Sequence, residues 1–276
     1  MITHELSPLI SKDGLKLHLT TNQVSNPIAG VLIVHGFGEH IGRYDHVYSA
    51  FEKEKIAIYG MDLRGHGKSE GKKGHARSYE LLMDDIEELM KSFRADHNDL
   101  PMFLYGHSMG GNLVANFVIR KKTNELAGFI LSSPWLKLAF DPPAWQTKAA
   151  GILAKMLSSF TMNNNLNADD LSKIESVARD YETDPLVNSK ISAGLYVMIS
   201  KAGQFALNNK NKIELPGLLY HGDADQITSH AATKEFAEGL TQVKWISYPN
   251  VRHEGHNDSE QADIIKNCID WVKQTI

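Results

Sequence analysis

The sequence predicts an α/β fold in which a mostly parallel central sheet is flanked by helices and carries a helical cap insertion. Short, continuously apolar runs recur along the chain, separated by segments with apolar residues at helical spacing. Strands that are apolar on both faces are typical of parallel sheets covered by helices. The alternation stops near residue 137 and returns near residue 212. We therefore expect a core of residues 1–136 and 212–276, with residues 137–211 inserted as a helical cap.

The individual elements follow from the two periodicities. Buried strands are expected over residues 29–34, 56–61 and 102–105, and further strands over residues 127–132, 217–220 and 243–248. An alternating edge strand is expected over residues 15–19, after the Asp13-Gly14 turn. Amphipathic helices are expected over residues 44–55, 78–93, 112–119, 229–240 and 259–272.

Composition excludes several classes of protein. The chain has 276 residues, and its net charge of −4 and lack of a basic stripe argue against a nucleic-acid partner. The one cysteine, Cys268, lies on an apolar helical face, so no intrachain disulfide is possible and a packing role is expected. We find neither a signal-peptide pattern nor an apolar run of membrane-span length. A cytoplasmic protein is expected, and peripheral contact with a membrane is the open alternative.

The segment Gly106-His107-Ser108-Met109-Gly110 is a G-x-S-x-G placed between an expected strand and an expected helix. This is the context of a nucleophile elbow, in which a serine sits at the tip of a sharp turn. Side chains two residues before and after that serine would collide with the facing strand and helix, and glycine removes them. Ser108 is therefore the expected nucleophile.

A serine needs a base within hydrogen-bond reach, and the base needs an orienting acid. In the elbow order these residues follow the serine as acid and then histidine. Asp223 and Asp225 follow one late strand, and His253 and His256 follow the next. We favour Asp225, because Asp223 is suited to capping the turn; spacing alone leaves the two histidines open. No metal site is expected, because H-E-G-H lacks the helical spacing of H-E-x-x-H.

An oxyanion formed at Ser108 needs backbone N–H donors. One is expected from Met109, directly after the serine, and the other from the Gly-rich segment His35-Gly-Phe-Gly38 after an earlier strand. Phe37 is the expected second donor. Three charged or polar residues follow: Glu39, His40 and Arg43. They are expected to brace this loop, and the alternative is that they belong to the site itself.

Five segments together resemble the monoglyceride lipase family of α/β-hydrolases, which also includes lysophospholipase-like esterases. They are residues 35–44, 62–71, 106–111, 221–225 and 248–254. The resemblance implies the α/β-hydrolase fold, a mobile apolar cap and hydrolysis of monoacylglycerols, with no cofactor. It also implies Asp225 as the acid, His253 as the histidine, and Phe37 and Met109 as oxyanion donors. The bulky ring of Phe37 is expected to narrow or line the pocket.

Two segments of the expected cap carry apolar side chains that could bind an acyl chain. The candidates for this contact are Ile152, Met156, Phe160, Leu195, Met198 and Ile199. An apolar cap would also favour peripheral contact with a membrane or micelle. The alternative is a second helical layer without a role at the site.

The expected reaction is hydrolysis of a small lipid ester by a serine hydrolase. The alternatives are a lysophospholipase or short-chain carboxylesterase and, more remotely, a non-catalytic binding member of the fold. The sequence carries no signal for the oligomeric state.

Overall fold

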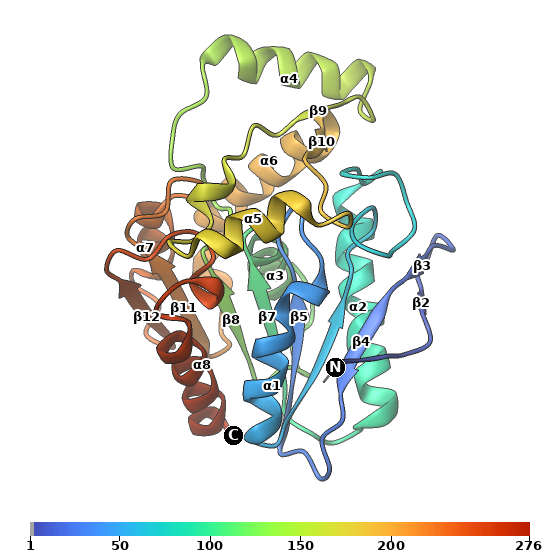
Figure 1. Ribbon diagram of the computed structural model, residues 1–276, viewed down its shortest axis with the longest axis vertical. Helices are drawn as coiled ribbons and strands as arrows, with labels where there is room; N and C mark the ends of the chain where they lie inside the picture. Colours follow the sequence, from blue (N-terminus) through green and yellow to red (C-terminus); the bar gives the residue numbers. More distant parts are fainter. Residues whose placement is uncertain (1–2) are drawn as a thin grey trace.

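The computed structural model describes residues 3–276 and contains a central sheet of eight strands (Figure 1). Their order is β1–β4–β6–β5–β7–β8–β11–β12. The bounds are β1 Thr3–Glu5, β4 Leu19–Asn22, β5 Ala29–Val34, β6 Ile56–Met61, β7 Met102–His107, β8 Gly128–Ser132, β11 Gly217–Gly222 and β12 Val243–Tyr248. The six strands from β6 to β12 run parallel, whereas β4 and β1 are antiparallel to their neighbours. The predicted mostly parallel sheet is confirmed.

Helices cover both faces of the sheet (Figure 1), which is why β5, β6 and β7 are buried along their whole length. On one face lie α1 (Asp45–Lys53) and α8 (Gln261–Thr275), whose apolar stripes form one core cluster with β5 and β6. On the other face, α2 (Tyr79–Asp96), α3 (Met109–Arg120), α6 (Ala193–Asn209) and α7 (His230–Ala237) form the larger cluster. Four 3₁₀ turns join these elements: η1 Ile41–Tyr44, η2 Ala168–Asp170, η3 Lys210–Lys212 and η4 Gly255–Asn257.

The strand expected over residues 15–19 is divided in the structure. Lys16–Leu17 forms β3, which pairs with β2 (Leu9–Ile10) in a separate ribbon, and the chain then enters the main sheet as β4. Gly14 makes the ribbon's turn with a φ of 88°, a left-handed conformation that suits glycine. The alternating pattern thus predicted extended backbone but not the change of partner.

The segment between β8 and β11 lies over the carboxyl edge of the parallel strands (Figure 1). It contains α4 (Ala144–Met156), α5 (Glu175–Thr183) and the short hairpin of β9 (Thr161–Asn163) and β10 (Lys190–Ser192). α6 ends the segment and packs against α3 inside the larger core cluster. The division into a core and a 137–211 cap stays a prediction, and α6 contributes to the core as well. Within residues 3–276, no helix combines the length and apolar character needed to cross a membrane.

Candidate active site

Ser108 stands at the turn between β7 and α3, in a backbone conformation that non-glycine residues rarely adopt, with φ 52° and ψ −114°. A Cβ atom on Gly110 would lie 1.9 Å from the Val34 carbonyl oxygen of β5. A Cβ atom on Gly106 would lie 2.4 Å from the Gly110 carbonyl oxygen. Both glycines are therefore needed for α3 to pass this close to the sheet, as the sequence predicted.

Asp225 and His253 are in contact, each on the loop that follows a strand. The His253 Nδ1 atom lies 2.7 Å from the Asp225 Oδ2 atom, and both side chains are buried. Burial opposes the charged form of each residue. Nevertheless, His253 and His221 hold the pKa of Asp225 well below its ordinary value, and Asp225 raises the pKa of His253. The arrangement suits a carboxylate that orients an imidazole and stabilises its protonated form.

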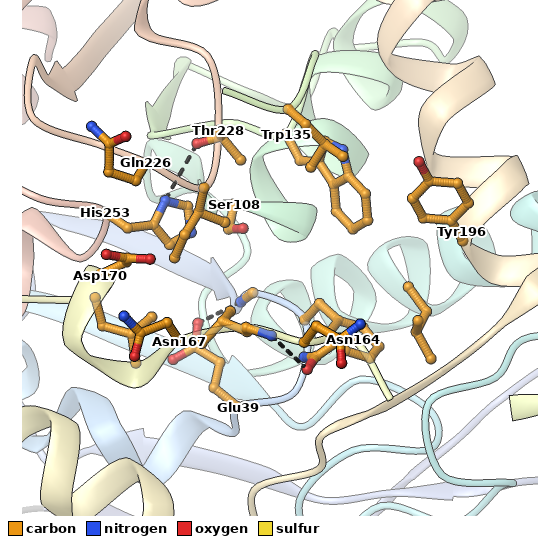
Figure 2. Close-up of a pocket in the computed structure, with 18 of the residues that line it drawn as sticks. Glu39, Ser108, Trp135, Asn164, Asn167, Asp170, Tyr196, Gln226, Thr228 and His253 are labelled. Carbon is orange, nitrogen blue, oxygen red and sulfur yellow. Dashed lines mark hydrogen bonds between the residues drawn. The ribbon is translucent and has the colours of Figure 1, made fainter. Parts of the chain in front are cut away.

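Ser108 and His253 line the same cavity, whose volume is about 380 Å³ (Figure 2). The ring of His107, the residue before the serine, lies 4.8 Å from the His253 ring between centroids. Because Nδ1 of His253 faces Asp225, its Nε2 atom is left for the cavity side. This is the nitrogen that a base needs to accept a proton from a serine hydroxyl.

The two competing sequence candidates occupy other positions. Asp223 is exposed, and its Oδ1 atom accepts the Asn250 amide at 2.6 Å, so it braces the loop after β12. His256 is buried and stacks on Tyr44 with 4.7 Å between ring centroids. Burial holds the pKa of His256 well below its ordinary value. Neither residue belongs to the cavity wall.

The loop expected to supply an oxyanion donor is held by Glu39. The Gly36 amide donates to the Glu39 Oε1 atom at 2.6 Å, and the Tyr44 hydroxyl donates to the same atom at 2.9 Å. The Phe37 side chain lines the cavity, as expected of its bulk. Met109 opens α3 at the position where helix amides lack intrahelical partners, although its side chain is buried in the core. Donation to an oxyanion by these two amides stays a prediction.

Arg43 joins the Phe37 loop to the His253 loop. Its guanidinium binds Glu254 in bidentate fashion at 2.5 and 2.8 Å and approaches Glu39 at 3.2 Å. Both carboxylates are buried. Burial and Glu254 raise the pKa of Glu39, whereas Arg43 overcomes the effect of burial on Glu254 and lowers its pKa to about 2. The predicted bracing role of Glu39 and Arg43 fits this geometry. His40, the third expected brace, pairs with Asp184 at 2.8 Å.

The cavity is lined by both apolar and polar side chains. Apolar lining side chains include Phe37, Trp135, Leu138, Phe140, Met162, Ile191, Tyr196 and Ile227. Polar lining side chains include Asn163, Asn164, Asn165, Asn167, Asp170, Gln226 and Thr228. Figure 2 shows Gln226, Asp170 and Asn167 on the side of His253, and Trp135, Tyr196 and Asn164 on the other side of Ser108.

The six cap residues predicted to contact substrate do not line this cavity, which corrects the sequence prediction. Ile152, Met156 and Phe160 are at least half exposed. Leu195 and Ile199 are buried in the larger core cluster, and Met198 borders a second hollow between α4 and α6. Helical spacing shows that a helix has an apolar stripe, but it does not show which neighbour that stripe faces. Ala150 of α4 and Tyr196 of α6 line the cavity instead.

Several residues at the site were not predicted from the sequence. His221 and Thr228 both contact the Asp225 carboxylate, at 2.8 and 2.9 Å. The H-G-x-x-D spacing of His221 and Asp225 could have signalled the first contact. The Asn163–Asn167 run could have signalled the polar wall. No group of three His, Cys, Asp or Glu side chains in the described residues could hold a metal ion.

Comparison with known proteins identifies the family. The sequence pattern described as "Serine aminopeptidase, S33" matches residues 25–260. An uncharacterized abhydrolase domain-containing protein of Dictyostelium discoideum is 32% identical over the whole chain, which spans 30% of that longer protein. Mouse monoglyceride lipase is 32% identical, over 99% of this chain and 91% of its own length. The crystal structure of Paleococcus ferrophilus monoacylglycerol lipase superposes with a TM-score of 0.86 at 27% identity, covering 94% of this chain and 99% of that one. The chain therefore belongs to the serine aminopeptidase S33 family and is a serine hydrolase of the lipase and esterase kind, with the α/β-hydrolase fold.

Proposed function

We propose that this enzyme hydrolyses monoacylglycerols to a fatty acid and glycerol, with Ser108, His253 and Asp225 as its catalytic triad. The observation that carries the proposal is the position of Ser108 and His253 at the wall of a cavity lined by both apolar and polar side chains. The similarity to monoglyceride lipases supports the same substrate class.

The reaction would proceed through an acyl-enzyme. Ser108 attacks the ester carbonyl while His253 accepts its proton, and Asp225 stabilises the imidazolium that forms. The amides of Phe37 and Met109 donate to the oxyanion, and each such donor contributes about 3–4 kcal/mol of transition-state stabilisation. His253 then gives the proton to the leaving glycerol, and water hydrolyses the acyl-enzyme.

The cavity supports a substrate with one acyl chain and a small polar alcohol. Each methylene transferred from water to apolar side chains of the cavity stabilises the bound chain by about 0.8 kcal/mol. The amide side chains of Asn164, Asn167 and Gln226 offer donors and acceptors to glycerol hydroxyls. A volume of about 380 Å³ is in the range of cavities that hold a single small-molecule ligand, which favours a substrate with one acyl chain.

A substrate panel tests this proposal. We expect kcat/KM to be higher for monoacylglycerols than for the matching diacylglycerols, triacylglycerols or lysophosphatidylcholine. The Ser108→Ala variant should lose about 10⁴-fold or more in kcat and escape labelling by a fluorophosphonate probe. His256→Ala is the matched control for His253→Ala and should stay labelled. Equal rates on mono- and triacylglycerols would reject the one-chain cavity, and a strict preference for acetate esters would favour a short-chain esterase.

The exposed side of the segment over the sheet supports contact with a lipid surface. Large apolar side chains gather there, with Trp145, Ile152 and Met156 exposed by 69%, 59% and 76%. Lys148 and Lys155 lie on the same helix. A helix with exposed apolar and basic side chains is typical of binding to anionic lipid interfaces. We expect Met156→Ser to weaken sedimentation with vesicles containing anionic phospholipid without slowing hydrolysis of a water-soluble ester; unchanged sedimentation would argue against this contact.

A further inference from the structure

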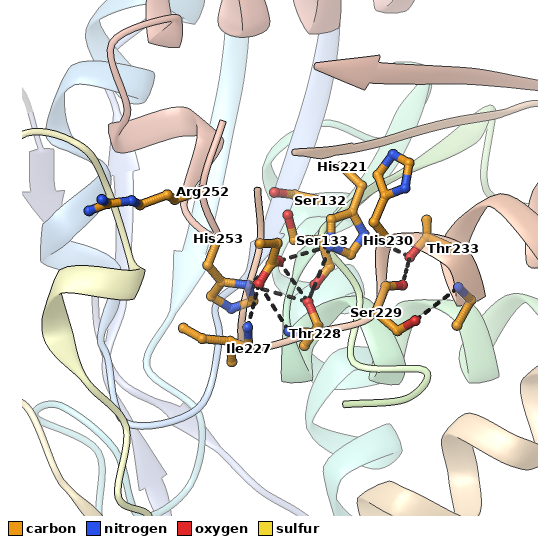
Figure 3. Close-up of polar contacts among 12 residues, drawn as sticks. Ser132, Ser133, His221, Ile227, Thr228, Ser229, His230, Thr233, Arg252 and His253 are labelled. Carbon is orange, nitrogen blue, oxygen red and sulfur yellow. Dashed lines mark hydrogen bonds and ion pairs between the residues drawn. The ribbon is translucent and has the colours of Figure 1, made fainter. Parts of the chain in front are cut away.

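Two histidine rings approach the Asp225 carboxylate. Its Oδ2 atom lies 2.7 Å from Nδ1 of His253 and 2.8 Å from Nε2 of His221. Its Oδ1 atom accepts the backbone amides of Ile227 and Thr228, at 2.7 and 3.0 Å. Figure 3 shows His221, Thr228 and His253 within one chain of polar contacts. The proposed triad thus continues beyond its acid to a second imidazole.

The His221 ring is held by contacts on both of its nitrogens. It is completely buried on β11, and its Nδ1 atom lies 2.8 Å from the Thr233 hydroxyl of α7. An ionised carboxylate has no hydrogen to donate, so the Nε2 atom facing Asp225 must carry one. In the neutral ring, Nδ1 then accepts the hydrogen of the Thr233 hydroxyl. These two contacts fix both the orientation and the tautomer of His221.

The Oδ2 atom of Asp225 is shared among several donors. The Thr228 hydroxyl is 2.9 Å from Oδ2, with the Ser133 carbonyl oxygen as its alternative acceptor at 3.1 Å. Each hydrogen bond donated to Oδ2 neutralises part of the negative charge that would otherwise act on His253. Other titratable groups lie nearby. The His107 ring lies 4.8 Å from the His253 ring between centroids, and the carboxylates of Glu254 and Glu39 also raise the pKa of His253. The ring of His230 meets His221 edge-on with centroids 5.6 Å apart. His230 pairs with the Ser247 hydroxyl at 2.7 Å and does not touch Asp225.

We infer that His221 is a positioning residue of the hydrolytic reaction. Its Nε2–H group fixes the orientation of the Asp225 carboxylate and neutralises part of the negative charge that acts on His253. Two consequences follow from this contact. Without it, the carboxylate can rotate and His253 loses its alignment toward Ser108. The charge on Oδ2 would also act more strongly on His253, which would then hold its proton to a higher pH. The inference rests on the proposed triad of Ser108, His253 and Asp225.

A pair of substitutions at His221 separates this contact from packing. The side-chain amide of His221→Gln reaches the place of Nε2 and keeps a donor to Asp225. The amide of His221→Asn is one bond shorter and reaches only toward Thr233. We expect His221→Asn to lower kcat/KM on a water-soluble ester by about 100-fold, the loss that a misplacement of about 1 Å can cause. We also expect its acid limb of kcat/KM to move to higher pH, and His221→Gln to recover most of the activity.

The His253 Nδ1–H proton gives an independent readout. In a short hydrogen bond to a carboxylate this proton has a far-downfield NMR signal, which His221→Asn should shift and His221→Gln should largely restore. His230→Asn makes the same change on the neighbouring histidine and should leave both the signal and the pH profile as in the wild type. If His221→Asn is not recovered folded, Thr233→Val removes the hydroxyl that holds Nδ1 of His221. The contact of Nε2 with Asp225 should then weaken, and the acid limb should move in the same direction.

The outcomes are distinguishable. Wild-type activity in His221→Asn, or equal losses in the Asn and Gln variants with an unmoved acid limb, would overturn the positioning role. A wild-type pH profile in Thr233→Val would overturn it as well. The Ser108→Ala variant, assayed in parallel, tests the triad itself. Activity retained in Ser108→Ala would refute the proposed function, whereas an inactive Ser108→Ala beside an unaffected His221→Asn would refute only the role of His221.

Discussion

Replacing Arg43 by methionine would remove the positive charge shared by two buried carboxylates. The Arg43 side chain is 10% exposed, and those of Glu39 and Glu254 are each 2% exposed. Removing one partner of a buried ion pair costs about 3–5 kcal/mol, because it leaves the other charge without compensation. In a chain of this size each kcal/mol lowers the melting temperature by about 2–4 °C. We therefore expect Arg43→Met to lose about 4 kcal/mol of unfolding free energy and about 10 °C in melting temperature.

The loss should shrink in acid, and the sign follows from the pKa values. In the wild type, Arg43 lowers the pKa of Glu254 to about 2, so its stabilisation is present above the unfolded value and is lost as pH falls toward 2. In Arg43→Met, burial alone would raise the pKa of Glu254 above the unfolded value. The variant would then take up a proton on folding, and its deficit would decrease as pH falls below that raised pKa.

Urea unfolding at pH 7 and pH 5 measures both effects. Adding Glu254→Gln to Arg43→Met should recover part of the lost free energy, because one uncompensated charge is removed. Arg179→Met is the matched control, since Arg179 is 71% exposed beside Asp180 and should change stability by no more than about 0.5 kcal/mol. A loss below about 1 kcal/mol in Arg43→Met, the range of surface ion pairs, would refute the reasoning.

Three further predictions concern the elbow, the buried histidines and metals. Gly110→Ala should cost about 3 kcal/mol or more and prevent fluorophosphonate labelling, because its Cβ would lie 1.9 Å from the Val34 carbonyl oxygen; wild-type melting and labelling would contradict the steric account. Burial lowers the pKa of His35 to about 4 and those of His66 and His107 to about 3. Below pH 6.5 these three histidines bind protons in the unfolded chain but not in the folded one, so the free energy of unfolding should fall by about 4 kcal/mol for each pH unit of acidification near pH 5. Equal urea midpoints at pH 7 and pH 5 would contradict this. Activity should survive EDTA, and a loss restored by zinc or calcium would require a different mechanism.

Sequence patterns predicted the strands and helices of the sheet layers well. The expected bounds of β5, β6 and β12 are those observed. β5 and β6 are apolar runs that end at polar or turn residues, and β12 is a mixed strand between Gln242 and Pro249. The short α5 was missed. It has only Ala178 and Tyr181 buried, so it carries no stripe for periodicity to detect. Local patterns succeed where one element buries a continuous surface and fail where it contributes one or two side chains.

The candidate site divides in the same way. The elbow and the convergence of Ser108, Asp225 and His253 follow from strand ends meeting at one edge of the sheet. The predicted cap contacts were wrong because the side of α4 and α6 that faces the cavity depends on how the two helices cross. The local sequence of neither helix specifies that crossing. The H-G-x-x-D spacing brings His221 and Asp225 within reach of each other, but only the fold shows that both side chains are buried and hydrogen-bonded.

The long connection from β8 to β11 has a consequence for how enzymes on this scaffold diversify. β8 and β11 pair with each other in the sheet, with Leu131 opposite Leu219, and the connection between them takes no part in that pairing. Each doubling of a flexible connection costs only about 0.6 kcal/mol in closure entropy, so the sheet tolerates large changes there. Two parts are exceptions. α6 packs against α3, the helix behind Ser108. The residues around α5 are hydrogen-bonded to the Phe37 and His253 loops. Evolution, or a designer, can thus exchange the stretch holding α4 to admit new esters, while α5, α6 and the sheet preserve the chemistry.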